Sequence, residues 1–402
     1  MSTAAADAAA AAVSRDRVVA LTEALVRCDT QNPPGRESSV VPALVGVLEG
    51  LGCAVEVVEP VVGRPSVLAT YRPAGAGDAG TLLVNGHLDV VPVVADDWTH
   101  PPFAPTLVGT RLHGRGTADM KGGIAAALEG LAACRDAGVE PRATIAFHLV
   151  ADEETGGAHG TEALVAAGRV HADACIIPEP TELGISVAER GSVQVRVRVE
   201  GEAGHGSEPG AARSAIADAA RMITALHDGA VSAAAHPYVG TPTCNVALVE
   251  GGVARNVVAP WCTFVLDRRT APGETLDDVL AGLRRVIDAA CPGAVYALET
   301  LVVVEASEVA ADHPFPRFVA GLTGAGDPGE LIGLSLGTDG RFLRNQLAIP
   351  TVIYGPGSIR QAHTADEWVE VGELVAAART FARAYASFTA GGVTPSSASS
   401  AR

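Results

Sequence analysis

Residues 120–150 read MKGGIAAALEGLAACRDAGVEPRATIAFHLV. The alanine-rich stretch Met120–Ala137 predicts a helix, and the apolar run Thr144–Val150 predicts a buried strand. The same alternation continues on both sides, with strand-like runs at Thr81–Asn85 and Ala174–Ile177. Strand, helix and strand at this spacing indicate an α/β layer, with helices on the faces of a largely parallel sheet.

The middle of the chain has a different pattern. Ser186–Glu200 alternates polar and apolar residues with period two, which is typical of a strand with one solvent-exposed face. The stretches that follow complete the order βαββαβ of a ferredoxin-like domain. They are Ala212–His227, Thr243–Val249, Trp261–Asp267, Leu276–Ala290 and Ala294–Val304. A strand at Pro350–Tyr354 and a helix at Val371–Ser387 then return to the first pattern.

These patterns predict an α/β protein of two domains. A ferredoxin-like domain, residues 187–304, would be inserted into a larger domain whose mostly parallel sheet lies between helices and which comprises residues 14–186 and 305–390. The alanine tract Met1–Val13 has the low-complexity composition of a loose end. Residues 391–402, GGVTPSSASSAR, predict a disordered tail.

Charge and cysteine usage exclude several classes. The 402 residues carry 29 Lys+Arg and 46 Asp+Glu, a net charge of −17, whereas nucleic acids and anionic membranes require clustered cations. No apolar run approaches the ~18 residues of a membrane span, and the N-terminus lacks the basic start of a signal peptide. Seven widely spaced cysteines without a C-x-x-C pair favour a reducing, cytoplasmic location.

Five short segments place His, Asp or Glu beside predicted strands or helices, where open α/β sheets bind ligands. They are GHLD at 86–89, GRGTADMKGG at 114–123, DEETGG at 152–157, PEP at 178–180 and QAHTADE at 361–367. Each has a structural alternative when taken alone. Asp119 can cap the following helix, and the acids after Val150 can form a solvated turn. The G-x-G at 114–116 could suggest a dinucleotide loop, but Asp119 occupies the place of the third glycine.

Taken together, the segments supply five ligands of the nitrogen and oxygen kind that Zn²⁺ and similar ions bind. These are His87, Asp119, Glu154, Glu179 and His363. A carboxylate shared by two ions would give each ion three protein ligands, with a position left open for water. Asp89 could hold the imidazole of His87 from behind, and Glu153 could act on the water as general base. Such a centre hydrolyses an amide or an ester.

The motifs resemble those of the two-zinc amidohydrolases, a family that includes acetylornithine deacetylase, succinyl-diaminopimelate desuccinylase, aminoacylase-1 and glutamate carboxypeptidase. The resemblance extends from Thr30 to Glu370 and includes GHGSEP at 204–209 and GPGSIRQAHTADE at 355–367. It implies a zinc-hydrolase domain with an inserted lid and dimerisation domain, and hence a homodimer. It also implies a cofactor of two divalent metal ions, which are zinc in the family it resembles, although Co²⁺ and Mn²⁺ accept the same ligands.

The resemblance assigns the metal ligands to two groups. His87 and Glu179 would hold one ion, Glu154 and His363 would hold the other, and Asp119 would bridge them. In similar enzymes the first histidine is oriented by a nearby carboxylate, which corresponds to Asp89, and the general base corresponds to Glu153.

The inserted domain would contribute further site residues. In similar enzymes a histidine at the position of His205 reaches across the dimer interface and stabilises the oxyanion. Asn256 and Arg269 match positions that bind the substrate carboxylate. Arg269 is preferred to Arg268 because it has the D-x-R-x-x-P-G spacing of the family.

The expected reaction is metal-dependent cleavage of the amide bond of a small N-acyl amino acid. Glu179 is typical of the deacylases and carboxypeptidases of the family, whereas aminopeptidases and dipeptidases tend to have Asp there. The run Gly355–His363, together with Thr338–Arg341, most resembles the acetylornithine deacetylase branch. Two alternatives are a carboxypeptidase that acts on a peptide or a conjugated amino acid, and a catalytically silent metal-binding relative. Intact Glu153 and His205 argue against the silent relative.

Overall fold

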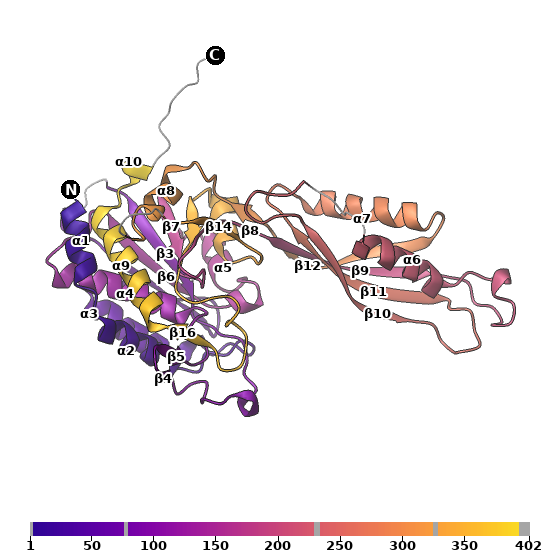
Figure 1. Ribbon diagram of the computed structural model, residues 1–402, viewed down its shortest axis with the longest axis horizontal. Coiled ribbons are helices and arrows are strands. Elements are labelled where there is room, and N and C mark those ends of the chain that lie inside the picture. Colours follow the sequence, from indigo (N-terminus) through magenta and orange to yellow (C-terminus); the bar gives the residue numbers. More distant parts are fainter. Residues whose placement is uncertain (1–2, 76–78, 229–233, 325–328, 394–402) are drawn as a thin grey trace, which may run out of the picture. The chain divides into compact units, whose positions relative to one another are not determined.

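The computed structural model describes residues 3–75, 79–228, 234–324 and 329–393 (Figure 1). The chain forms two compact units, and each is described by itself. Unit 1 comprises Met1–Val187, Val309–Ile332 and Thr338–Arg402, and unit 2 comprises Ala188–Glu308 and Gly333–Gly337. The expected insert, residues 187–304, shares most of its residues with unit 2.

The nine-stranded sheet has a parallel centre and antiparallel edges. Its central strands are, in order, β6 (Thr144–Val150), β3 (Thr81–His87), β7 (Ala174–Ile177) and β15 (Thr351–Ile353). Its outer strands are β1 (Ala54–Val61) and β2 (Arg64–Tyr71) on one side, and β8 (Ile185–Glu189), β13 (Ser307–Glu308) and β14 (Leu331–Leu334) on the other. The predicted α/β fold with a mostly parallel central sheet is confirmed.

Burial on both faces explains the apolar runs of the central strands. Every residue of β7 is buried, and so is every residue but the first of β3 and of β6. A strand that is covered on both sides needs apolar residues at consecutive positions, so it appears in the sequence as a continuous run. The bounds predicted for β6 and β7 agree with the structure.

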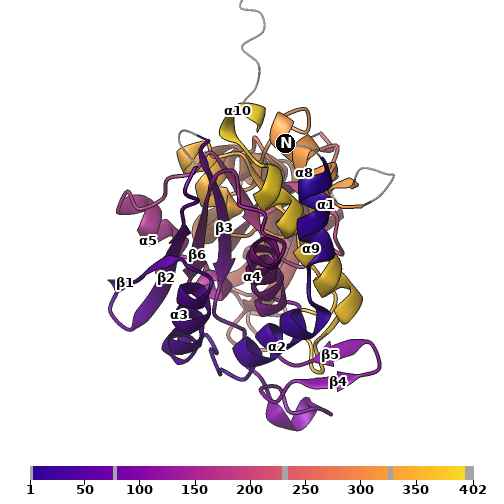
Figure 2. The ribbon, with the colours of Figure 1, turned by 90° about the vertical axis from the view of Figure 1, so that its left-hand side faces the viewer.

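Helices of unit 1 pack against one another beside this sheet. Figure 2 shows α1, α4 and α9 side by side, and α4 also contacts β3. The helices of this unit are α1 (Thr3–Ala11), α2 (Arg15–Val26), α3 (Val41–Gly50), α4 (Lys121–Asp136), α5 (Thr161–Ala166), α8 (Pro314–Ala320), α9 (Val371–Ser387) and α10 (Ala390–Val393). All residues of α4 from Lys121 to Cys134 are buried, because its alanines and glycines allow neighbouring elements to approach closely.

The expectation of loose chain ends is wrong where the structure describes them. The alanine tract forms α1, and Ala9 and Ala10 are 0% and 2% exposed against α4 and α9. Alanine has the highest helix propensity, and its small side chain suits close helix packing. At the other end, residues 391–393 belong to α10, and residues 394–402 of the expected tail lie outside the described residues.

A small three-stranded sheet carries the segment after His363. Its order is β16 (Trp368–Glu370), β5 (Arg111–His113) and β4 (Thr106–Val108), and both pairs are antiparallel. This pairing brings the chain that follows His363 beside the chain that leads to Asp119. No helix within the described ranges is both long and apolar enough to cross a membrane.

Unit 2 has the element order βαββαβ and a four-stranded antiparallel sheet in the order β10, β11, β9 and β12. Its elements are β9 (Gly191–Glu200), α6 (Ala215–Asp228), β10 (Thr243–Gly251), β11 (Trp261–Thr270), α7 (Leu276–Ala290) and β12 (Val295–Val304). Apolar residues of α6 and α7 pack with those of β9 and β11 in one core. The predicted ferredoxin-like topology is confirmed.

The prediction of one continuous strand over Ser186–Glu200 is wrong. The chain divides at Arg190 into β8, which joins the large sheet, and β9, which belongs to the sheet of unit 2. All residues of β8 are buried. The predicted alternation of buried and more exposed residues occurs only in β9. Arg190 marks the break, because its main-chain N–H donates to the oxygen of Leu334 and its Nε donates to that of Val239 at 2.8 Å.

Candidate active site

Predicted metal ligands lie at or shortly after the carboxyl ends of three strands of the large sheet. His87 is the last residue of β3, Glu154 lies in the 3₁₀ turn Glu153–Thr155 after β6, and Glu179 follows β7 by two residues. Because these strands are parallel neighbours, their carboxyl ends meet at one edge of the sheet.

Asp119 reaches this edge from the loop before α4. The N-cap of α4 is Met120, and the Asp119 carboxylate faces two histidines instead of the helix, so the structural alternative of an N-cap at Asp119 is wrong. Gly123 lets the first turn of α4 approach the segment after β7, since a Cβ at this position would lie 1.9 Å from the main-chain oxygen of Pro178. His363 comes from the loop after β15, where it has a left-handed φ of 61°.

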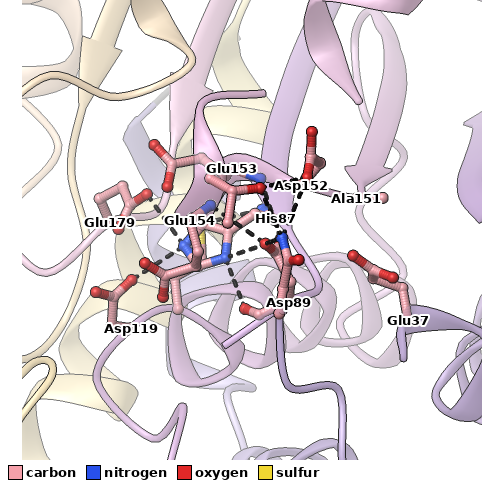
Figure 3. A network of polar contacts seen from close by, with 12 residues as sticks. Glu37, His87, Asp89, Asp119, Ala151, Asp152, Glu153, Glu154 and Glu179 are labelled. Carbon is pink, nitrogen blue, oxygen red and sulfur yellow. Dashed lines mark hydrogen bonds and ion pairs between the residues drawn. The ribbon is translucent and has the colours of Figure 1, made fainter. Parts of the chain in front are cut away.

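The carboxylate of Asp119 lies between the two histidines. Its Oδ1 is 3.0 Å from Nε2 of His87, and its Oδ2 is 3.3 Å from Nε2 of His363. Each histidine also faces a second carboxylate. Nε2 of His87 is 3.3 Å from Oε1 of Glu179, and Nε2 of His363 is 2.9 Å from Oε2 of Glu154. Figure 3 shows Glu179 and Asp119 directed at His87. The five predicted ligands therefore form two groups that share Asp119.

The donor set fits divalent cations. The described residues include two groups of three that could hold an ion, and within each group the ligand atoms lie within 4.8 Å of one another. One group is His87, Asp119 and Glu154, and the other is His87, Glu153 and Glu179. His87 is 1% exposed, and Asp119 and Glu179 are each 6% exposed. Several carboxylates brought together away from water require compensating positive charge. Imidazole nitrogens and carboxylate oxygens are suitable ligands for Zn²⁺ and similar ions.

Asp89 organises the loop after β6. Its Oδ1 accepts a hydrogen bond from the main-chain N–H of Glu153 at 3.2 Å, and its Oδ2 accepts from that of Glu154 at 3.2 Å. Nδ1 of His87 is 2.9 Å from the main-chain oxygen of Asp89 and 3.7 Å from its Oδ1. The main-chain carbonyl of Asp89 is therefore closer to the imidazole than the carboxylate is, and it is the group that orients the ring. With Nδ1 donating to this carbonyl, Nε2 of His87 is available to a cation.

A chain of polar contacts supports this loop from behind (Figure 3). Nδ2 of Asn32 donates to Oδ2 of Asp89 at 2.8 Å and to Oδ1 of Asp152 at 3.2 Å. Asp152 has a left-handed φ of 74° and pairs with Arg64 at 2.9 Å, and Arg64 also pairs with the buried Glu37. The two glutamates that follow Asp152 are thus fixed through main-chain and side-chain contacts on both sides.

The carboxylates change the pKa values of the histidines they face. Burial by itself lowers the pKa of His87, but Glu179 and Asp119 raise it well above its ordinary value. Hydrogen bonds to Asp119 and Glu154 raise the pKa of His363 to about 10. Burial raises the pKa of Glu179 to about 8. Protons therefore occupy these groups at neutral pH when no cation is bound.

The metal-free protein is expected to lose stability as the pH rises from about 5 to about 10. The ordinary pKa values of Glu and His are about 4.3 and 6.5, below those of about 8 for Glu179 and about 10 for His363 in the folded protein. The folded state binds more protons across this interval, so the free energy of unfolding decreases with rising pH.

A divalent cation that binds these groups would replace their protons, so its stabilising effect is expected to grow with pH. The rise in Tm on adding Zn²⁺ should be larger at about pH 8 than at about pH 6, measured by calorimetry in chelator-treated and metal-loaded samples. Equal gains at both pH values would contradict the prediction.

Gly157 is expected to tolerate no side chain. A Cβ there would lie 2.4 Å from Oδ1 of Asp339 and 2.8 Å from Cε2 of Phe342, and the φ of Gly157 is +73°. Gly157→Ala should lower the free energy of unfolding by about 2–4 kcal/mol through left-handed strain and overpacking. Gly168→Ala is the control, because Gly168 has a φ of +63° and open space around it. If urea unfolding gives the same loss of unfolding free energy for Gly157→Ala and Gly168→Ala, left-handed strain alone explains it and overpacking at Gly157 is excluded.

His205 and Asn256 lie on two loops of unit 2 that pair with each other. His205 forms a bridge with Val257, and the main-chain N–H of Gly206 donates to the oxygen of Asn256 at 2.9 Å. Both side chains are exposed, and Nδ1 of His205 is 2.7 Å from Oγ of Ser207.

The neighbouring arginines of β11 differ in exposure. Arg268 is 1% exposed, and its Nη2 pairs with Oε1 of Glu274 at 2.7 Å. The side chain of Arg269 is 38% exposed and pairs with Asp267 at 3.0 Å. Successive side chains of a strand point to opposite faces. Arg269 is therefore the arginine of this pair that a ligand carboxylate can reach.

Sequence reasoning missed several residues that shape the centre. Asp152 begins the motif DEETGG, and Asn32 lies two residues after Thr30, where the family resemblance starts, but the sequence predicts no role for either. Glu367 is 0% exposed and binds the loop before Asp119, and Asp339 is 2% exposed beside Gly157. Asp152, Glu367 and Asp339 are part of the motifs DEETGG, QAHTADE and Thr338–Arg341, and this membership was the only signal for them in the sequence.

The fold and the paired histidine and carboxylate groups are those of a metallohydrolase. A family model described as Peptidase family M20/M25/M40 matches residues 83–387, more than half of the chain. The chain belongs to this family. An acetylornithine deacetylase of Salmonella paratyphi B is 34% identical over 346 residues, which are 83% of this chain and 86% of that protein.

Solved structures show the same fold. Aminopeptidase PepT of Bacillus cereus has a TM-score of 0.76 at 22% identity, over 93% of this chain and 99% of that one. A dinuclear metal binding peptidase of the M20 family from Bacillus subtilis has a TM-score of 0.69 at 16% identity, over 92% of this chain and 97% of that one. At these identities the likeness establishes the fold.

Proposed function

We propose that this protein is a dinuclear metal-dependent deacylase that cleaves the amide bond of an N-acyl amino acid. The observation that carries the proposal is Asp119, whose two oxygens face two different histidines, each of which is paired with a further carboxylate. A single carboxylate in this position suits two cations that act on one water molecule. The dinuclear relative from Bacillus subtilis supports the proposed metal count.

In this proposal His87 and Glu179 hold one ion, Glu154 and His363 hold the other, and Asp119 bridges them. Two divalent cations at these positions, zinc ions in our proposal, would supply the positive charge that lowers the pKa of a water molecule and polarises the scissile carbonyl.

Glu153 would be the general base. Burial raises its pKa well above the ordinary value, and the nearby carboxylates of Glu179 and Asp339 raise it further, whereas His87 opposes them. Its carboxylate would take a proton from the attacking water and later deliver this proton to the leaving amine. Asp89 would keep Glu153 in place through its hydrogen bond to the main chain.

The proposal also gives roles to residues of unit 2. We assign the oxyanion contact to His205 and the substrate carboxylate to Asn256 and Arg269, since a guanidinium binds a carboxylate through two parallel hydrogen bonds. The exposure of Arg269 and the burial of Arg268 support the choice between them. A homodimer and a cytoplasmic location complete the proposal.

We base the proposed acyl group and amino acid on the Salmonella relative. Its name, together with the runs Gly355–His363 and Thr338–Arg341, favours N-acetylornithine or a related N-acetyl amino acid. Succinyl-diaminopimelate is the alternative substrate among the N-acyl amino acids.

Turnover of a substrate panel tests the function. Release of free amine is measured with N-acetyl, N-succinyl, N-formyl and peptide substrates, using protein reconstituted with Zn²⁺, Co²⁺ or Mn²⁺ and a chelator-treated control. Turnover of an N-acyl amino acid that chelation removes and metal restores is the expected result. Preference for peptides with a free carboxylate would favour a carboxypeptidase. Silence across the panel with two ions bound per chain would favour the silent relative.

A further inference from the structure

The buried carboxylate of Glu367 binds the loop that leads to Asp119. Glu367 is 0% exposed. Its Oε2 accepts hydrogen bonds from Nη1 of Arg115 at 2.6 Å and from the main-chain N–H of Gly116 at 3.0 Å. Its Oε1 accepts from the main-chain N–H groups of Ala118 at 2.8 Å and Asp119 at 3.0 Å. Both oxygens are thus fully engaged with a single loop.

The main chain of Glu367 binds the same loop. Its carbonyl oxygen accepts from the N–H of Gly114 at 2.9 Å, directly after the antiparallel pairing of β16 with β5. Arg115 is held in addition by Trp98, whose ring centroid lies 5.1 Å from the guanidinium carbon. The loop is therefore clamped along its length from residue 114 to residue 119.

The segment that carries Glu367 also carries His363. Between them, Oδ1 of Asp366 accepts hydrogen bonds from the main-chain N–H groups of Thr99 at 2.8 Å and His100 at 3.1 Å. His363 faces Oδ2 of Asp119 at 3.3 Å, while Glu367 holds the N–H of the same aspartate. One short stretch of chain thus contacts Asp119 at its side chain and at its main chain.

We infer that Glu367 is a positioning residue that fixes Asp119 relative to His363. It would thereby set the geometry of the proposed metal position that Asp119 shares with Glu154 and His363. The inference rests on the proposed function, because it assigns metals to these residues. Glu367 touches neither the proposed metals nor the substrate, and its effect passes through Asp119. The reactions of the centre use none of its atoms.

Glu367→Gln tests the inference with little change in size. A glutamine has one acceptor oxygen, and its amide NH₂ would face either Arg115 and Gly116 or the N–H groups of Ala118 and Asp119. Two donors would then point at each other, and the loop would shift. Supporting residues of metal ligands change metal affinity or activity by about 10–100-fold when they are substituted. We expect a loss of that size in the affinity for one of two ions, with a similar loss in kcat and a KM changed less than about twofold.

Glu370→Gln is the matched control. Glu370 is the last residue of β16, the strand that directly follows Glu367. It pairs with Arg111 at 2.9 Å, where the side chains of Glu370 and Arg111 are 29% and 51% exposed. Metal affinity is measured by competition with a chromophoric chelator, bound metal by elemental analysis, and folding of the metal-free proteins by circular dichroism and Tm. The control should match the wild type in all of these.

The outcomes separate the two proposals. Wild-type protein that fails to bind two ions would overturn the proposed function. Wild-type protein that binds two ions, with a folded Glu367→Gln variant of equal affinity and kcat, would overturn the inference alone. A lower Tm with unchanged metal affinity would also overturn it, since the role would then be only structural. If Glu367→Gln does not fold, Glu367→Asp replaces it, and the same loss of affinity for one ion is expected because the shorter side chain cannot reach all four donors.

Discussion

Glu153→Gln is expected to lower kcat by about 10²–10⁴-fold while two metal ions stay bound. A glutamine keeps the size and the main-chain hydrogen bond to Asp89, but it cannot take a proton from water. The proposed ligands, Asp119 among them, are unchanged. Metal content per chain and steady-state kinetics on the best substrate of the panel measure the two parts of the prediction.

Glu162→Gln serves as the control for Glu153→Gln. Glu162 is exposed on α5, nine residues further along the chain, and it should be replaceable without effect on kcat. Activity near the wild-type level in Glu153→Gln would contradict the assignment of the general base. Loss of the metals in this variant would instead make Glu153 a ligand, which its position within 4.8 Å of ligand atoms of His87 and Glu179 would allow.

Asp119→Asn is expected to abolish turnover and to weaken the binding of both ions. An asparagine offers one oxygen, so it cannot present an anionic oxygen to each histidine as Asp119 does at 3.0 and 3.3 Å. The carboxylates of Glu154 and Glu179 would remain close together with less cationic charge between them. We expect fewer than two ions per chain by elemental analysis and a kcat near background.

Asp136→Asn is the matched control for the loss at Asp119. Asp136 is the last residue of α4, and its side chain is 52% exposed where it pairs with Arg17. Exposed ion pairs contribute about 0–1 kcal/mol, so metal content and kcat should be unchanged. Two tightly bound ions in Asp119→Asn would exclude a bridging carboxylate at this position.

The elements that could be predicted were those with long apolar runs or strong periodicity. β6, β7, α7 and α9 agree with their predicted bounds. The strands β4, β5 and β16 were missed because three residues are too few for a periodic pattern, whereas β15, which has the same length, lies in the predicted apolar run Pro350–Tyr354. The helix α1 was mistaken for a loose end, because a tract of small residues does not by itself indicate what packs against it.

Four of the candidate metal ligands could also be predicted because they stand close to the end of a strand or the start of a helix, whereas His363 lies in the loop between β15 and α9 and was predicted from its motif. Parallel neighbouring strands bring such positions together by topology, and no precise distance is needed for that inference. The chemistry of imidazole and carboxylate groups then indicates cations. The order of residues therefore predicted the fold class, which the structure confirms, and proposed the candidate ligands His87, Asp119, Glu154, Glu179 and His363.

Only the tertiary structure could reveal the contacts that hold those ligands. Glu367 is 252 positions from Arg115, and Asn32 is 57 positions from Asp89. The carboxylate of Asp89 was expected to hold His87, yet it binds the main chain of Glu153 and Glu154. Local sequence encodes which groups are present at a strand end. Hydrogen-bond partners far along the chain depend on how the elements pack, and a carboxylate removed from water accepts whichever donors that packing brings within reach.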